Sequence, residues 1–382
     1  MSLNRITMAE VARAAAVHQT TVSLALRNDP RLPRETRLRI RALAESMGYR
    51  PDPMLSALNF YRTSRDAAKT QPSIAFLMRS RKNLPAEHFS VDDRFLNGAR
   101  LACERMGFRI VPLQIENSPA EGTRLTRVLR SRGIHGVILA SLDVTLRELA
   151  LDWDYFSALC IESQHLGLQL HTVANNQTSA TRTAVRRLIE LGYRRIGLAV
   201  GEIEETSLEK PFSAGHLLEI HEHRRIPFIA PLLLRIAAET RLAAELGAWV
   251  RRNRIEAVLC NWSNISELLN MTGLRVPQDV GVATLDHNPR RGAAAGIRQS
   301  HELVGERAVE GLALLMKTNQ RGLITLPNTT LIDGVWQDGP ELPPKNDQAL
   351  GNRKSSVNRK ESPKKNGADP AAFDLNQERK GR

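Results

Sequence analysis

A short segment near the amino end carries hydroxyl, amide and imidazole side chains that could form hydrogen bonds with DNA. Residues 17–26 read VHQTTVSLAL, and helical spacing places Val22 and Leu26 on the inward side. The side chains expected to point outward are His18, Gln19, Thr20, Ser23 and Leu24. A small helix with this polar face, held by a second helix across a short turn, has the helix-turn-helix geometry that enters the major groove.

The preceding residues predict the helix that would hold it. Thr7 can cap a helix through its hydroxyl, and Glu10, three residues later, can bond back to the amide of Thr7, which is a capping box. Apolar residues then recur at helical spacing at Met8, Val11, Ala12 and Ala15. The two segments therefore predict two short helices joined by a turn that contains Val17.

A third helix is expected from about Pro33 to Gly48. Proline suits a first helical turn, and glycine can end a helix in the left-handed conformation. The apolar positions are Ile40, Leu43, Ala44 and Met47, and the opposite side carries Arg34, Arg37, Arg39 and Arg41. Three short helices around a small apolar centre, with arginines outside, predict a DNA-binding headpiece.

The charge distribution supports a polyanionic partner. The chain of 382 residues has a formal net charge of +13. Residues 1–65 hold a surplus of +6 and residues 345–382 a surplus of +5, which leaves +2 for the whole middle. Basic ends favour nucleic acid through counterion release. The tail is polar, with few bulky apolar residues, so we expect it to be disordered.

Other features point to the cytoplasm. The first residues are polar and lead into a helix cap, which predicts no signal peptide. The most apolar run, residues 226–234, contains Pro227 and Pro231 and is too short to span a bilayer, so we expect no membrane contact. Cys103, Cys160 and Cys260 lie far apart in apolar surroundings and are expected to be buried free thiols in a reducing compartment.

After a linker that includes a short amphipathic stretch (residues 54–60), the pattern alternates between strands and helices. Expected strands are 74–78, 110–113, 136–140, 158–161, 196–200, 257–260 and 280–284, and expected helices are 91–106, 122–132, 178–191, 240–253 and 302–317. Three helices end at glycine just before a strand, at Gly107, Gly133 and Gly192. This pattern predicts parallel α/β sheets, and about 270 residues is enough for two lobes.

The chain resembles the lactose-repressor (LacI/GalR) family of bacterial transcription regulators over roughly residues 5–340. The motifs that carry the resemblance are ITMAEVARAAAV, TTVSLALRN, MGYRPDP, VANNQTSATRTAVRRLIELGYRRIGLAVG, VLCNW, LRVPQDVGVATLD and VGERAVEGLALLM. The resemblance implies a helix-turn-helix headpiece that binds operator DNA as a homodimer. It also implies a two-lobed core like a periplasmic binding protein, with a small-molecule effector between the lobes.

The family's base-reading positions match Gln19, Thr20 and Leu24. Gln19 could contact adenine through two hydrogen bonds, and Thr20 and Leu24 could touch a thymine methyl. Leu58 matches the hinge leucine that wedges into a minor-groove step, although it could instead only pack the hinge dimer. The residues expected to contact phosphates are Thr7, Thr21, Ser23, Arg27 and Arg37. His18 replaces the usual serine cap.

The turn and the effector cleft depart from the family pattern. Ala16 replaces the usual glycine, which is acceptable if the turn is not left-handed. Asn261 and Asp286 match positions that bind sugar hydroxyls, whereas Phe212 replaces an arginine and Trp262 an aspartate. These changes favour a less polar or smaller ligand, or a site that has lost its ligand.

We considered an enzyme and a metalloprotein and rejected both. The chain has no Gly-x-Ser-x-Gly, P-loop or Gly-x-Gly-x-x-Gly motif, and no cofactor is expected. His216, His221 and His223 do not have the spacing of a zinc site and are expected on a solvated helix. Two alternatives remain open: a solute-binding protein without a DNA role, and an effector-independent DNA-binding protein.

The predicted organisation is a headpiece (1–50), a hinge helix and linker (51–71), a core (72–344) and a basic tail (345–382). In the core we expect one lobe at about 72–174 plus a later crossover segment. The second lobe is expected at about 175–295 plus the final strands. The predicted function is a cytoplasmic, nucleoid-associated homodimer that binds a palindromic operator under control of a sugar-like effector. Repression is favoured over activation, because occupying a promoter needs no further contact surface.

Overall fold

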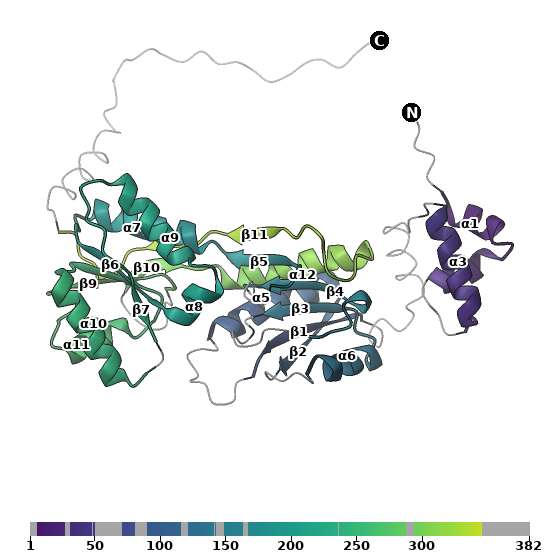
Figure 1. The fold of residues 1–382 in the computed structure, drawn as a ribbon, viewed down its shortest axis with the longest axis horizontal. Coiled ribbons are helices and arrows are strands. Elements are labelled where there is room, and N and C mark those ends of the chain that lie inside the picture. The colour runs from purple at the N-terminus through teal and green to yellow at the C-terminus, as the bar shows by residue number, and fades with distance from the viewer. Residues whose placement is uncertain are drawn as a thin grey trace, which may run out of the picture. The chain divides into compact units, whose positions relative to one another are not determined.

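The computed structural model describes residues 6–26, 31–47, 49, 71–80, 90–115, 121–140, 142, 149–162, 167–235, 237–287 and 294–345. The chain divides into two compact units (Figure 1). Unit 1 comprises Met1–Ala180, Gly201–Phe212 and Gln299–Val335, and unit 2 comprises Thr181–Val200, Ser213–Arg298 and Trp336–Arg382. The predicted hinge stretch and the tail beyond residue 345 lie outside the described residues.

The amino-terminal helices α1 (Met8–Ala14), α2 (Gln19–Leu26) and α3 (Arg34–Ser46) form a small apolar core of their own. The sequence predicted these helices, and most of the residues expected to face inward are buried there. One fully buried residue of α2 was not predicted. Ala25 is fully buried together with Val22, whereas Leu26 is half-buried and packs against the edge of the cluster.

Unit 1 contains a parallel sheet with the strand order β11-β5-β4-β3-β1-β2. Its strands are β1 (Ser73–Arg79), β2 (Arg109–Ile115), β3 (Gly136–Ala140), β4 (Ser157–Ile161), β5 (His171–Asn175) and β11 (Thr329–Ile332). Along β1, Phe76 packs in the same cluster as α5 (Ser90–Met106) and α12 (His301–Lys317), whereas Leu77 packs in the cluster of α6 (Glu121–Ser131). The sheet is therefore covered on both faces, as its continuous apolar strands require.

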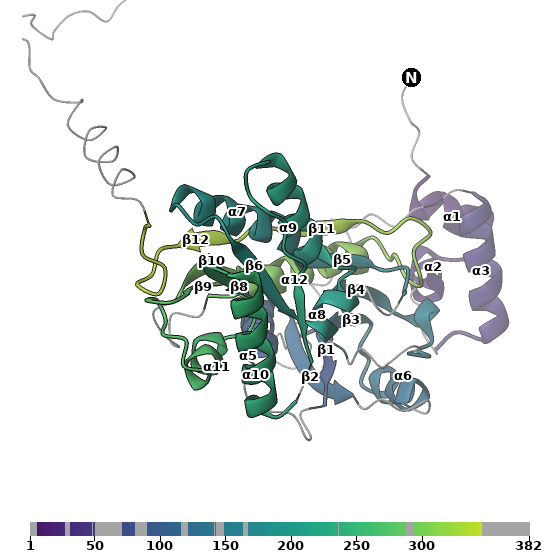
Figure 2. The same ribbon diagram turned by 60° about the vertical axis from the view of Figure 1, so that its left-hand side comes forward.

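Unit 2 contains the second sheet, with the order β12-β10-β9-β8-β6-β7. The strands are β6 (Ile196–Gly201), β7 (Leu232–Leu234), β8 (Ala257–Cys260), β9 (Gly281–Thr284), β10 (Ala295–Arg298) and β12 (Val335–Gln337). Its helices are α7 (Gln177–Glu190), α9 (Pro211–Glu222), α10 (Glu239–Asn253) and α11 (Ile265–Met271), whereas the short helix α8 (Glu202–Ser207), which precedes α9, belongs to unit 1. Figure 2 shows α10 and α11 side by side.

The seven strands and five core helices expected from the sequence are all present, with bounds that shift by only a few residues. The three cysteines are buried and free, as predicted. Burial raises the pKa of Cys103 to about 11 and that of Cys160 to about 12, which keeps both as unreactive thiols.

Among the described residues, no helix combines the length and the apolar character that a membrane crossing demands.

Candidate nucleic-acid interface and effector-binding residues

The predicted capping box is present at the start of α1. The Glu10 amide donates to Thr7 Oγ1 at 3.3 Å, and the Thr7 amide donates to Glu10 Oε2 at 2.6 Å. The bond from the Thr7 amide holds the pKa of the Glu10 carboxyl below its usual range. Thr7 is exposed, and its hydroxyl donates to Glu10 Oε2 at 2.8 Å, so the hydroxyl proton is used within the capping box. The cap thus sets where the helix-turn-helix begins.

The turn between α1 and α2 differs from the prediction. Ala16 has a φ of +54°, so the turn is left-handed at the position where the resemblance implies glycine. The Val17 amide donates to the Ala12 carbonyl at 3.0 Å, which closes the end of α1. A left-handed alanine costs about 1–2 kcal/mol, because Cβ approaches the following carbonyl oxygen. The expectation that Ala16 avoids this conformation was wrong, because the turn geometry requires it.

Helix α2 presents the predicted polar face. His18, Gln19 and Thr20 are exposed at its amino-terminal end. Thr21, Ser23 and Leu24 follow in the same helix and are half-buried, whereas Val22 between them is fully buried. The exposed end of a recognition helix is the part that reaches base edges. Six predicted contact residues therefore lie together on one short helix.

His18 occupies the amino-terminal capping position of α2. Its carbonyl oxygen accepts from the amides of Thr21 at 2.9 Å and Val22 at 3.3 Å. Its ring Nδ1 lies 2.9 Å from Thr20 Oγ1 and 3.4 Å from the Thr20 amide nitrogen. The imidazole thus lies where a serine hydroxyl usually caps a helix.

Helix α3 supports the other two. Arg37 is half-buried on α3, whereas Arg34, Arg39 and Arg41 are exposed. Arg39 donates from its guanidinium to the carbonyl of Ala15 at 3.5 Å, which links α3 to the end of α1. Predicted contact residues Arg27 and Leu58 lie outside the described residues, as does the helix end expected at Gly48.

Two of the predicted effector residues lie at the same edge of the unit 2 sheet. Asn261 follows β8 and Asp286 follows β9, and these strands are parallel neighbours with Cys260 opposite Thr284. The carboxyl edge of a parallel sheet is where ligands of α/β folds bind. Both residues are half-buried, and the Asp286 amide donates to Thr284 Oγ1 at 3.1 Å.

The two aromatic candidates, Phe212 and Trp262, are buried or half-buried in the core. Trp262 packs against the apolar cluster of unit 2, and its amide donates to Cys260 Sγ at 3.2 Å. Phe212 is 3% exposed and is the second residue of α9. Phe212 belongs to unit 1 and Trp262 to unit 2.

The histidines of α9 are not all on a solvated surface. His216 is completely buried, with Nε2 3.4 Å from the Ile196 carbonyl oxygen, and burial lowers its pKa to about 4. His221 is exposed, and His223 lies 3.3 Å from a carboxylate oxygen of Glu219. Within the described ranges, no three His, Cys, Asp or Glu side chains are grouped to hold a metal ion. The expectation of a solvated helix was therefore wrong for His216.

A partly buried polar network in unit 1 was not predicted from the sequence. Glu162 Oε1 accepts from the Asn175 amide at 2.9 Å and from Asn175 Nδ2 at 2.7 Å, and Nδ2 also lies 3.1 Å from His301 Nδ1. Glu162 follows β4 and Asn175 ends β5, so both lie at the carboxyl edge of the sheet. Nearby, Gln299 Nε2 donates to Gln177 Oε1 at 2.8 Å. The sequence does contain a signal for this network, because Glu162 and Asn175 are polar residues at the ends of apolar strands.

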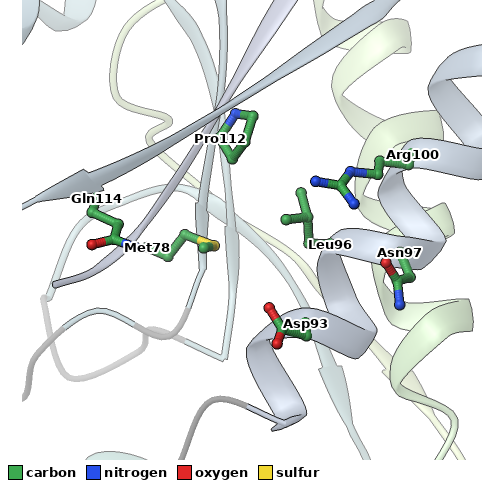
Figure 3. A pocket seen from close by; sticks show the side chains of 7 residues that line it. All are labelled: Met78, Asp93, Leu96, Asn97, Arg100, Pro112 and Gln114. Atoms are coloured by element: carbon green, nitrogen blue, oxygen red, sulfur yellow. The ribbon is translucent and has the colours of Figure 1, made fainter. Parts of the chain in front are cut away.

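A surface hollow of about 470 Å³ lies between α5 and strands β1 and β2 (Figure 3). Its lining residues are Met78, Asp93, Leu96, Asn97, Arg100, Pro112 and Gln114. The α5 residues at positions 93, 96, 97 and 100 recur at helical spacing, so they form one face of the helix. β2 is the edge strand, and Pro112 within it has no amide to offer to another strand.

The chain is similar to known regulators in sequence. Residues 7–52 match the family model described as bacterial regulatory proteins, lacI family. The regulator PtxS of Pseudomonas plecoglossicida is 31% identical over 199 residues, an alignment that spans 52% of this chain and 54% of that protein. The HTH-type transcriptional repressor PurR of Pectobacterium carotovorum is 24% identical over 360 residues, spanning 88% of this chain and 98% of PurR.

Solved structures share the fold. A CelR–cellobiose complex matches with a TM-score of 0.54 and 20% identity, over 88% of this chain and all of that one. A lac repressor dimer bound to operator and the anti-inducer ONPF matches with a TM-score of 0.54 and 18% identity, over 89% of this chain and all of that one. The family match at residues 7–52 and the two-sheet core are both consistent with the regulators that the chain resembles. Residues 7–52 therefore match the lacI family of bacterial regulatory proteins, and the chain shares the fold of the solved regulators.

Proposed function

We propose that this protein is a transcriptional regulator that binds a palindromic operator as a homodimer and represses the adjacent promoter. The observation that carries the proposal is the helix-turn-helix of residues 7–52, with His18, Gln19 and Thr20 exposed at the end of α2. Occupying a promoter blocks transcription without a further contact surface, which favours repression. The protein acts in the cytoplasm on the nucleoid and has no catalytic role.

The contact residues divide into two classes. Gln19, Thr20 and Leu24 lie on α2 in positions to read bases in the major groove. A second group positions the helix on phosphates: Thr7, Thr21, Ser23, Arg27 and Arg37. Leu58 inserts into the minor groove at the centre of the operator. The last assignment, like that of Arg27, rests on the sequence resemblance.

A small-molecule effector bound to the core controls DNA binding, as the sequence resemblance implies. The support comes from the carboxyl edges of the two sheets, where ligands of such folds bind. Asn261 and Asp286 provide an amide and a carboxylate in unit 2, and the half-buried Trp262 beside Asn261 adds apolar surface, whereas Phe212 is buried in unit 1. A structurally similar regulator, CelR, is complexed with cellobiose, which supports a sugar-like effector. The effector shifts the population between two lobe arrangements by binding one of them better.

The homodimer has a candidate contact face on α5. Asp93 and Arg100 lie seven residues apart on the hollowed face, with Leu96 and Asn97 between them (Figure 3). A two-fold axis near Leu96 would place Asp93 of each copy against Arg100 of the other, because such interfaces are self-complementary. Pro112 in the edge strand β2 disfavours the alternative of pairing two sheets edge to edge.

Reversing the charge at this face should dissociate the dimer. Arg100→Asp places two carboxylates opposite each other twice per dimer, and we expect the dimer dissociation constant to rise by about 10–100-fold. The double variant Asp93→Arg, Arg100→Asp should restore the dimer, and Arg127→Asp on α6 is the matched control. Sedimentation equilibrium of wild type and the three variants measures the dimer dissociation constant. A dimer unaffected by Arg100→Asp would contradict this contact face.

The proposed function is tested by selecting operators from a random duplex pool with the full-length protein. We expect enrichment of a palindrome over random DNA by at least about 10³-fold in affinity at physiological salt. A solute-binding protein would enrich nothing. An effector-independent binder would keep the same affinity across a panel of mono- and disaccharides.

Two variants assign the contacts within that assay. Gln19→Ala should relax the preference at one base pair per half-site by about 1–3 kcal/mol. Arg37→Ala should weaken all sequences alike and reduce the slope of log affinity against log salt by about 1 per subunit. Equal loss for every base with Gln19→Ala would exclude a base-reading role for Gln19.

A further inference from the structure

The side chain that caps α2 also determines what its neighbour can offer to a base. His18 Nδ1 lies 2.9 Å from Thr20 Oγ1, and both side chains are on the exposed end of the helix. Thr20 is one of the residues assigned to base reading, so an inference about its hydroxyl rests on the proposed function. Which atom of this pair donates depends on the tautomer of the His18 ring.

The backbone decides the direction of the bond. The Thr20 amide nitrogen lies 3.4 Å from the same Nδ1, and a backbone N–H can only donate. Nδ1 therefore accepts, and the proton of the neutral ring is on Nε2. The Thr20 hydroxyl, which faces an acceptor, must donate its only proton to His18.

A threonine whose proton is already used has a changed recognition chemistry. Its oxygen keeps lone pairs and can accept from the amino group of adenine or cytosine, and its methyl can touch thymine. It has no proton left for guanine, which presents only the O6 and N7 acceptors in the major groove. A serine in place of His18 could equally well be donor or acceptor and would impose no such restriction.

We propose that His18 is a positioning residue that holds the Thr20 hydroxyl as an acceptor, so that the base read by Thr20 is not guanine. His18 acts through Thr20 and needs no base contact of its own. The bond also locks the Thr20 rotamer before DNA arrives, which reduces the ordering cost on binding.

The test compares base preference among full-length variants. The operator position read by Thr20 is first identified as the one whose preference changes in Thr20→Val, which keeps the shape and removes the hydroxyl. Wild-type protein should bind adenine or cytosine there at least fivefold more tightly than guanine. His18→Ala frees the hydroxyl and should bring guanine to within about twofold. His18→Asn supplies a carbonyl acceptor and should restore the exclusion.

A second readout needs no DNA. Hydrogen exchange of the Thr20 amide in the free chain should be faster in His18→Ala than in wild type and should be restored in His18→Asn. His221→Ala, at an exposed histidine of α9, is the matched control and should change neither readout. Uniform weakening for all four bases in His18→Ala, or failure of His18→Asn to restore the exclusion, would overturn the role of His18.

The two readouts also separate this inference from the proposed function. If wild-type protein selects no sequence at all, the proposed function fails and the specificity role fails with it. If a sequence is selected but Thr20 exchange is the same in His18→Ala and wild type, only the His18 contact is overturned.

Discussion

Replacing Gly305 with alanine is expected to destabilise unit 1 by about 3 kcal/mol or more. Gly305 lies on α12, and an added Cβ would be 2.0 Å from the carbonyl oxygen of Phe95 on α5. The same contact exists in reverse at Gly98 of α5, where a Cβ would be 1.8 Å from the Glu302 carbonyl oxygen. Both obstacles are backbone, so neither can rotate away, and the two helices must separate.

The measurement is urea unfolding and thermal unfolding of the full-length protein. A loss of about 3 kcal/mol should lower the melting temperature of unit 1 by about 6–12 °C. Gly311→Ala on the same helix is the matched control, because its Cβ would be 3.0 Å from a flexible end of the Leu159 side chain. Equal stability of the Gly305→Ala and Gly311→Ala variants would show that α5 and α12 are not in backbone contact.

The second large effect is the loss of stability of unit 2 at acid pH. His216 is buried with its pKa lowered to about 4, so the folded state binds its proton less tightly than the unfolded state does. Below the ordinary value of about 6.5, the unfolded chain binds more protons, and stability falls as the pH falls. The loss amounts to about 1.4 kcal/mol per pH unit, or on the order of 3 kcal/mol by pH 4.

Other groups also titrate in this range, so the test is a difference between variants. Glutamine at position 216 cannot be charged, and its amide can still donate to the Ile196 carbonyl oxygen. His216→Gln should therefore remove about 1.4 kcal/mol per pH unit from the pH dependence of urea unfolding between pH 6.5 and 4. His221→Gln, at an exposed histidine of the same helix, should leave the dependence unchanged. Parallel curves for wild type and His216→Gln would refute the assignment.

Most helices and the central strands could be predicted because their signals are local. Apolar residues at helical spacing predicted α5, α6, α7, α10 and α12, and short apolar runs predicted the strands that the helices cover. The strands β5, β7, β10 and β12 were missed. His171 and Thr172 in β5, or Gly296 and Arg298 in β10, interrupt an apolar run, and β5 also pairs with β11, a distant segment.

The residues of the recognition helix were predictable for the same reason, since the cap, the turn and the helix span about 20 residues. The conformation of Ala16 was not, because a single left-handed residue leaves no mark in an alanine-rich segment. The Glu162–Asn175–His301 network was also missed. Residues 175 and 301 are 126 positions apart, and only the parallel sheet and α12 bring them within hydrogen-bonding distance.

The sequence alone determined the helix-turn-helix, the alternation of strands and helices, and the concentration of positive charge at the two ends. These properties follow from side-chain type and periodicity, which act over a few residues. Only the tertiary structure decided that β11 joins the first sheet and β12 the second, that His216 is buried, and that His18 Nδ1 accepts from the Thr20 amide. Those features depend on packing and on hydrogen-bond geometry, which are defined only by the three-dimensional positions of the atoms.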